Sequence, residues 1–309
     1  MSSIGAQSME FRTHSKQYSD IDPKSTLKKS ASGKTIFISG ASRGIGRATA
    51  IAFAQAGAAA LYITARSENA LEETRLKVIE ANSETQCAYM TCDVTDAESV
   101  KAAVEDCAVR FGGIDVADAN AGYLDVWKKI GESDITSWWR SWEVNLKGAY
   151  LVARYAIPHL IESAQKFAEK GASGGHMILL SSVGAQLVMP GASDYQTAKH
   201  AINRFCEFIN IDHGEDGIKC FAIHPGGVPT DLARNMPEQL HAYLTEEPEL
   251  AAGFIVWLCS GQADWATGRY LSSTWDVGEL LQMQDQIVGD DLLVNRLRTT
   301  SCRGQGTRK

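Results

Sequence analysis

Short apolar runs alternate with longer stretches in which apolar residues recur at helical spacing, from Lys34 to about Ser272. The short runs are rich in β-branched residues and predict strands, whereas the periodic stretches predict helices. Strands are expected at residues 34–39, 61–64, 86–91, 114–119, 176–180, 218–223 and 269–272, with long helices at 138–169 and 193–213 among those between them. This alternation predicts a doubly wound (Rossmann) α/β fold, in which helices cover both faces of a parallel sheet of about seven strands.

The same pattern predicts one domain over residues 33–275, flanked by two extensions. Residues 1–32 are polar and lack periodicity, so we expect a flexible N-terminal arm that is loose or laid over the domain. Residues 276–309 combine an apolar helical pattern with a polar end. We expect this C-terminal extension to pack on the domain, on a partner subunit or over the mouth of the substrate site.

Composition narrows the class of protein. A net charge of −7 over 309 residues argues against a surface specialised for nucleic acid or anionic membranes. The seven cysteines are odd in number and contain no CxxC pair, so we expect reduced thiols and no metal site. No run of 18 apolar residues and no targeting signal is present, and we expect a cytoplasmic protein that acts on small molecules.

One segment carries enough chemistry to propose a reaction. Tyr195 and Lys199 stand four residues apart, so on a helix beginning near Ser193 they lie on one face. An ammonium beside a phenol favours the phenolate, and we expect Lys199 to lower the pKa of Tyr195 towards the working range. Ser182 follows a predicted buried strand, where its hydroxyl would face the ligand crevice of a parallel sheet. The pair alone is weak evidence, because about 0.4 such pairs are expected by chance in this composition.

A glycine-rich turn joins the first predicted strand to the first helix. Gly40, Gly44 and Gly46 follow a GxxxGxG spacing, and glycines let backbone amides at a helix start approach a pyrophosphate. A tight turn with no ligand is the alternative. The position of the glycine-rich turn in the first βα unit of an alternating chain favours dinucleotide binding.

Charge at the second strand bears on the choice of dinucleotide. The strand ends at Arg66, and no acidic residue precedes Glu68. A carboxylate there would bind a ribose 2′-hydroxyl, whereas Arg66 and Arg43 can hold a 2′-phosphate. We therefore expect NADP(H), although each arginine alone can be read as a solvated surface charge.

Taken together, these motifs resemble those of the short-chain dehydrogenase/reductase family over residues 33–275. Ile21-Asp22-Pro23 and residues 268–276 resemble, more narrowly, a subgroup common in fungal secondary metabolism. The matching pieces, in order, are residues 39–46, Asp93-Val94, Asn120-Ala121-Gly122, Asn145, Ser182, Tyr195 to Lys199 and residues 225–230. The resemblance implies that Tyr195 is the general acid/base, that Lys199 lowers its pKa and holds the nicotinamide ribose, that Ser182 orients the substrate carbonyl, and that Asn145 supports a water relay. It also implies cofactor contacts from Gly40, Ser42, Arg43, Gly44, Ile45, Gly46, Arg66, Asp93, Val94, Asn120, Ala121, Gly122, Pro225, Gly226, Val228 and Thr230, and a homodimer or homotetramer.

The predicted activity is hydride transfer between NADP(H) and a ketone or aldehyde, or the matching alcohol, with Tyr195 passing the proton. Two other classes stay open. One is a catalytically silent NADP(H)-binding regulator or assembly subunit, and the other is a dehydratase or epimerase on the same scaffold. The substrate itself cannot be read from the apolar residues of the predicted pocket segments.

Overall fold

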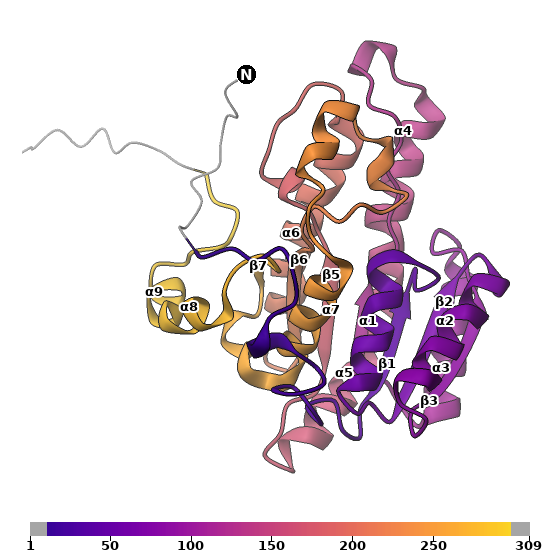
Figure 1. Cartoon of the computed structure of the whole chain (residues 1–309), viewed down its shortest axis with the longest axis vertical. Coiled ribbons are helices and arrows are strands. Elements are labelled where there is room, and N and C mark those ends of the chain that lie inside the picture. The colour runs from indigo at the N-terminus through magenta and orange to yellow at the C-terminus, as the bar shows by residue number, and fades with distance from the viewer. Residues whose placement is uncertain (1–10, 298–309) are drawn as a thin grey trace, which may run out of the picture.

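The computed structural model describes residues 11–297 and contains one seven-stranded sheet, as predicted. Every neighbouring pair of strands is parallel, in the order β3-β2-β1-β4-β5-β6-β7 (Figure 1). The strands are β1 (Thr35–Ser39), β2 (Ala60–Ala65), β3 (Gln86–Thr91), β4 (Val116–Ala119), β5 (His176–Leu180), β6 (Lys219–His224) and β7 (Arg269–Ser272). The chain reverses direction across the sheet between β1 and β4, which is where such folds bind ligands. The doubly wound fold is therefore confirmed.

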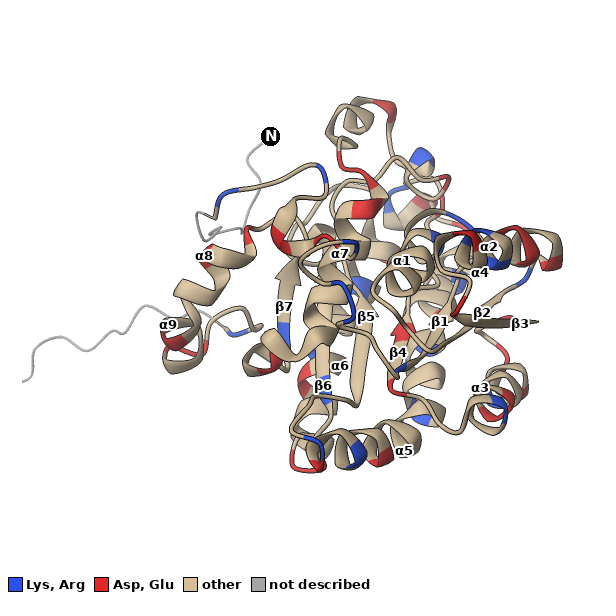
Figure 2. Cartoon of the chain, turned by 60° about the horizontal axis from the view of Figure 1, so that its bottom comes forward, with Lys and Arg blue, Asp and Glu red and all other residues tan. Residues whose placement is uncertain are grey.

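Helices cover both faces of this sheet (Figure 2). On one face, α1 (Gly44–Gln55), α2 (Glu68–Ala81) and α7 (Pro248–Trp257) enclose an apolar core that includes Ile38, Ile178 and Phe254. On the other, α3 (Ala97–Phe111), α5 (Gly148–Ala168) and α6 (Ser193–His213) enclose a second core that includes Phe37, Met177 and Ile202. Successive side chains of a strand point to opposite faces, so one run of apolar residues supplies both cores.

The long helix predicted at 138–169 is composite. It begins earlier, as α4 (Ile135–Trp142), passes through a π-helical segment (Glu143–Lys147) and continues as α5 to Ala168. Apolar periodicity does not distinguish a wider π turn from an α turn, so the sequence pattern gave one helix. The strand limits at β4 and β6 also differ from the expected ones, by two residues and by one residue respectively.

Residues 11–32 lie over the domain and are part of its core. Phe11, Ile21 and Leu27 are buried in the same apolar cluster as α1 and α7. A short 3-10 helix (Ser19–Ile21) crosses α7 where Gly253 leaves room for the Ile21 carbonyl. Residues 11–32 therefore have the second of the two predicted arrangements, in which the arm is laid over the domain.

The C-terminal extension packs on the domain and on the arm. It contains α8 (Val277–Gln282) and α9 (Gln284–Gly289), whose Leu280 and Ile287 are fully buried. His14 pairs with Asp276 at 2.9 Å, next to a bridge between Thr13 and Trp275. The start of the arm is therefore fastened to the segment between β7 and α8. None of the helices within residues 11–297 combines the length and apolar character that crossing a membrane requires.

Candidate active site

The candidate site lies at the carboxyl edge of the sheet, where the three longest loops meet. These follow β4 (residues 120–134), β5 (181–192) and β6 (225–247), and they rise above the sheet at the top of Figure 1. Short 3-10 helices interrupt them: Ile130–Glu132, Val183–Ala185, Ala233–Asn235 and Glu238–Tyr243. Every predicted catalytic residue stands on this edge or on a helix that starts or passes there.

Tyr195 and Lys199 occupy one face of α6, as their spacing predicts. Lys199 is 3% exposed, and its Nζ lies 5.6 Å from the centre of the Tyr195 ring. The ammonium donates to the Leu180 carbonyl at 2.7 Å, so the lysine is fixed against the end of β5. Ser182, two residues past β5, is hydrogen-bonded to the Tyr195 side chain and also accepts from the Gly184 amide at 3.0 Å.

The electrostatics of the pair differ from the prediction. Burial raises the pKa of Tyr195 to about 12, which outweighs the lowering by the hydrogen bond with Ser182, and the Asp194 carboxylate raises it further. Burial also lowers the pKa of Lys199 to about 7, because desolvation disfavours its charged form. The expectation that Lys199 holds the pKa of Tyr195 down is therefore not met in this structure. At neutral pH the phenol keeps its proton.

Asn145 lies in the π-helical segment and is 1% exposed. Its Nδ2 donates to the carbonyls of Tyr123, at 2.6 Å, and Ser141, at 2.8 Å, while its Oδ1 accepts from the Tyr123 amide. Asn145 thus ties the loop after β4 to the helix. Ser141 is in turn hydrogen-bonded to Asp194 at the start of α6, so this network reaches the residue before Tyr195.

The glycine-rich turn has the form that an anion requires. Gly40 and Gly44 have φ of 71° and 57°, a conformation that disfavours other residues. No side chain caps the amino end of α1, and no acidic residue stands in its first turn. Backbone amides with the positive end of the helix dipole behind them suit a pyrophosphate. Ser42, Arg43 and Ile45 belong to the same turn.

Two of the glycines are required by packing within the protein itself. A Cβ at Gly40 would stand 2.7 Å from the Ala121 Cα, and one at Gly46 would stand 2.4 Å from Asn120 Nδ2. Asn120 also donates to the carbonyls of Ser39 and Gly40, each at 3.0 Å. The absence of side chains therefore lets the loop after β4 seat on the turn, a reason that the sequence reasoning did not give.

The two arginines predicted to hold a phosphate have different surroundings. Arg66 is exposed at the end of β2 and takes part in no ion pair among residues 11–297. Arg43 instead pairs with Asp231, in the loop after β6, at 2.5 Å. Nothing in the sequence pattern linked Asp231 to the turn.

The remaining predicted cofactor residues lie on the same edge. Gly226, with φ of 86°, and Thr230 stand in the loop after β6, and the Thr230 methyl group approaches Gly44. Asp93 pairs with Arg140 at 3.3 Å, and Val94 packs against Gly148. Gly122, Pro225 and Val228 complete the set along the edge between β4 and β6.

Sequence reasoning missed the residues that support these loops. Arg47 donates to the Ser42 carbonyl and to Thr74, and Thr74 donates to the Ala41 carbonyl, so α1 and α2 together brace the glycine-rich turn. Glu246 accepts from the Gly227 amide at 2.7 Å and holds the loop after β6. These hydrogen bonds join residues 5 to 33 positions apart in the sequence, and they leave no periodic pattern of residues from which they could be predicted. His224, the last residue of β6, has a pKa lowered to about 4 by burial, which favours its neutral form.

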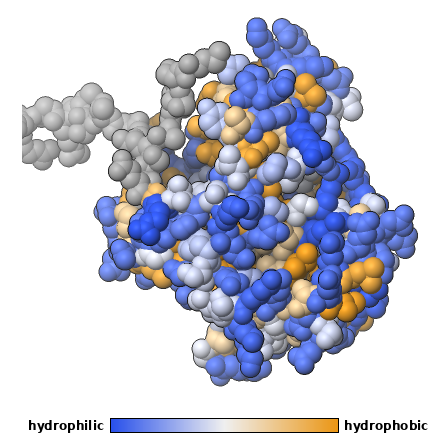
Figure 3. Space-filling view, in the orientation of Figure 1, coloured by the Kyte–Doolittle hydropathy of each residue, from blue (hydrophilic) through white to orange (hydrophobic). Residues whose placement is uncertain are grey.

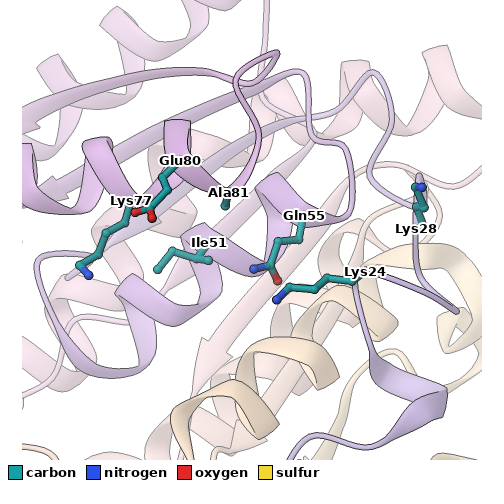
Figure 4. A pocket seen from close by; sticks show the side chains of 7 residues that line it. All are labelled: Lys24, Lys28, Ile51, Gln55, Lys77, Glu80 and Ala81. Carbon is teal, nitrogen blue, oxygen red and sulfur yellow. The ribbon is translucent and has the colours of Figure 1, made fainter.

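One groove lies away from this edge. It holds about 550 Å³ between α1, α2 and the arm, and none of the predicted site residues lines it (Figure 4). Its lining residues are Lys24, Lys28, Ile51, Gln55, Lys77, Glu80 and Ala81. Within residues 11–297 no group of three His, Cys, Asp or Glu side chains could hold a metal ion.

The comparisons with known proteins agree with this geometry. The family model described as Enoyl-(Acyl carrier protein) reductase matches residues 40–274. The chain belongs to the short-chain dehydrogenase/reductase family. Short chain dehydrogenase citE of Monascus ruber is 41% identical over 293 residues, which cover 93% of this chain and 97% of that protein. Short chain dehydrogenase pigC of the same organism is 38% identical over 288 residues, covering 91% and 90%.

Solved structures of the family share the fold. The 3-ketoacyl-(acyl-carrier-protein) reductase from Brucella melitensis, complexed with NADH, is 25% identical with a TM-score of 0.70, over 78% of this chain and 97% of that one. A dehydrogenase/reductase from Sinorhizobium meliloti is 27% identical with a TM-score of 0.69, over 80% and 95%. The assignment to the short-chain dehydrogenase/reductase family, an oxidoreductase family, that was made from the motifs is confirmed.

Proposed function

We propose that this short-chain dehydrogenase/reductase uses NADP(H) to reduce a ketone or aldehyde, or to oxidise the matching alcohol, in the biosynthesis of a secondary metabolite. The observation that carries the proposal is the protonated Tyr195 phenol, hydrogen-bonded to Ser182 with Lys199 on the same helix face, at the sheet edge that also holds the glycine-rich turn. The fungal relatives named short chain dehydrogenases support the biosynthetic setting.

The nicotinamide, when bound, supplies or accepts the hydride. The proposed tasks of the chain are to bind, orient and protonate. Ser182 donates to the substrate carbonyl oxygen and stabilises the negative charge that develops there, and Tyr195 gives that oxygen its proton. Lys199, which is held by the Leu180 carbonyl, then returns a proton to the Tyr195 phenolate. Asn145 holds the loop after β4 in place.

The choice of NADP(H) is supported by charge. Arg43 and Arg66 stand at the ends of β1 and β2, and no acidic residue occupies the end of β2. A 2′-phosphate carries negative charge that such residues attract, whereas a carboxylate at this place would repel it. The Brucella melitensis reductase is complexed with NADH in its solved structure, so NAD(H) is the alternative cofactor that a test must address.

An apolar substrate is supported by the rim of the site. Apolar residues are exposed at the top of the molecule, around the loops of the carboxyl edge (Figure 3). Large exposed apolar side chains on these loops and on α4 are Val126, Ile130, Ile135, Trp139, Val183, Val188 and Tyr243. Grouped apolar side chains on a soluble surface mark binding sites more often than isolated ones do.

The direct test follows absorbance at 340 nm with NADPH and NADH over a panel of apolar ketones and aldehydes. We expect turnover with NADPH, and we expect Tyr195→Phe to lose at least about a thousandfold in kcat while its Kd for NADPH changes little. Tyr62→Phe, which removes a buried phenol hydroxyl that donates to Asp106 on α3, controls for packing damage and should keep most of the activity. Unchanged turnover in Tyr195→Phe would remove Tyr195 from its role, and cofactor binding without turnover on any carbonyl would favour a silent binding protein.

A further inference from the structure

The ion pair between Arg43 and Asp231 spans the candidate cofactor crevice. Arg43 follows β1 and Asp231 follows β6, and these strands are separated in the sheet by β4 and β5. Three strand spacings correspond to about 14 Å. The Arg43 guanidinium nevertheless lies 2.5 Å from Asp231 Oδ2, because the loop after β6 folds back over the intervening strand ends.

A second contact fixes the same crossing. The methyl carbon of Thr230, the residue before Asp231, would stand 3.2 Å from a Cβ at Gly44, the residue after Arg43. Two adjacent residues of the loop after β6, Thr230 and Asp231, therefore contact two adjacent residues of the glycine-rich turn, Gly44 and Arg43. A dinucleotide bound at the turn would lie under or beside this crossing.

Asp231 has a second cationic partner. Its Oδ1 lies 3.4 Å from Arg234, so the carboxylate keeps a countercharge if Arg43 turns away. The Arg43 and Asp231 side chains are 68% and 48% exposed. An ion pair this open contributes little to stability and can exchange one partner for another.

We propose that Asp231 is a specificity-determining residue, whose carboxylate competes with the 2′-phosphate of NADP(H) for Arg43 and so limits the preference for NADP(H) over NAD(H). The inference rests on the proposed function, since it requires a nicotinamide dinucleotide in the crevice. Arg43 cannot hold both anions in full contact, and the carboxylate also repels an approaching phosphate. NAD(H) lacks that phosphate, so its binding leaves the ion pair intact.

The competition also links cofactor choice to the loop. When Arg43 turns to a phosphate, the loop after β6 loses its ion pair with the turn and keeps the Thr230 contact. Asp231 then holds Arg234 within its own loop. The state of residues 225–235 thus differs between the NADP(H) and NAD(H) complexes.

The test measures Kd for NADPH and NADH, by quenching of protein fluorescence, in the wild type and in Asp231→Asn, Arg43→Gln and the double variant. We expect Asp231→Asn to tighten NADPH binding by about threefold to tenfold and to change NADH binding by less than about twofold. In the Arg43→Gln background the same substitution should give no gain. Asp291→Asn, which removes an exposed Arg–Asp pair (Arg296–Asp291, 2.9 Å) far from the turn, is the matched control and should change neither Kd.

Other results contradict the inference. Weaker NADPH binding in Asp231→Asn would mean that the ion pair clamps the cofactor, and equal gains for NADPH and NADH would mean a general charge effect. A gain that persists in the double variant would remove Arg43 from the competition. Failure of the wild type to bind either dinucleotide would contradict the proposed function itself, which separates the two failures.

Discussion

At the scale of single residues, the chemistry depends on how burial sets protonation. Lys199 is buried and Tyr195 is half-buried, and loss of water around them raises the pKa of the Tyr195 phenol to about 12 and lowers that of Lys199 to about 7. Both shifts favour the neutral forms. A neutral phenol is the form that donates a proton, which suits the proposed reduction.

Asp194 is a residue whose charge should tune this phenol. It precedes Tyr195, is 8% exposed, and its carboxylate raises the pKa of Tyr195, although burial is the larger cause. Asp194→Asn removes that charge, so the phenolate is less disfavoured and the pKa of Tyr195 falls. We expect the alkaline limb of kcat/KM for carbonyl reduction to move to lower pH by about half a unit to one unit.

The measurement is a pH profile of kcat/KM from 8 to 12, a range that includes the pKa of about 12 and the expected lower value. Asp125→Asn is the control, because the Asp125 carboxylate affects the pKa of Asp194 but does not shift the pKa of Tyr195. The alkaline limb of the Asp125→Asn profile should therefore coincide with that of the wild type. A limb that is unmoved in Asp194→Asn, or moved to higher pH, would show that the carboxylate does not act on the phenol.

At the scale of elements, two features place the site residues. The π-helical segment between α4 and α5 widens the helix by one residue where Asn145 stands, and directs its amide to the loop after β4. Asn120, which follows the neighbouring strand β4, donates to the carbonyls of Ser39 and Gly40 where the glycine-rich turn begins. The turn and the loop therefore form one unit.

Gly46→Ala tests the close packing of that unit. The added methyl group would stand 2.4 Å from Asn120 Nδ2 and 2.6 Å from the Gly40 carbonyl oxygen, so one of them must move. We expect a loss of about 1 to 3 kcal/mol in the free energy of unfolding, measured by chemical denaturation, together with weaker dinucleotide binding. Gly131→Ala, where a Cβ meets nothing within 4 Å, is the control and should change stability by less than about 0.5 kcal/mol. Equal stabilities for the two variants would contradict the packing argument.

At the scale of the whole molecule, the arm and the C-terminal extension enlarge the core of the domain. Ile21 and Leu27 from the arm and Leu280 and Ile287 from the extension are all fully buried with residues of α1 and α7. Buried aliphatic side chains of this size contribute about 1.5 to 3 kcal/mol each. The apolar core therefore includes residues on both sides of the range 33–275.

Gly253→Ala tests whether the arm is part of the cooperative unit. On α7 a Cβ at this position would stand 2.4 Å from the Ile21 carbonyl oxygen and 2.8 Å from the Gln17 side chain, so the arm must lift. We expect a loss of about 1 to 3 kcal/mol in the free energy of unfolding and faster tryptic cleavage at Lys24 and Lys28. Gly289→Ala, with open space around its Cβ, serves as the control. Destabilisation without faster cleavage in the arm would mean that the strain is relieved elsewhere.

The sequence by itself determined the doubly wound α/β fold class, the seven strands to within two residues, and the family. It did so because strand periodicity, helix periodicity and the spacing of Tyr195 and Lys199 are local properties of the chain. The location of Ser182 at the candidate site could also be predicted from the sequence, because Ser182 follows a buried strand and parallel strands bring their carboxyl ends to one edge of the sheet.

Only the tertiary structure decided what surrounds these residues. The π segment at Asn145, the packing of Asn120 against Gly46 and the burial of the arm follow from contacts between distant parts of the chain. The raised pKa of Tyr195 follows from desolvation, which depends on everything that covers the ring and not on Lys199 alone. The pairing of Arg43 with Asp231 brings together two residues 188 positions apart, and no local pattern encodes such a distance.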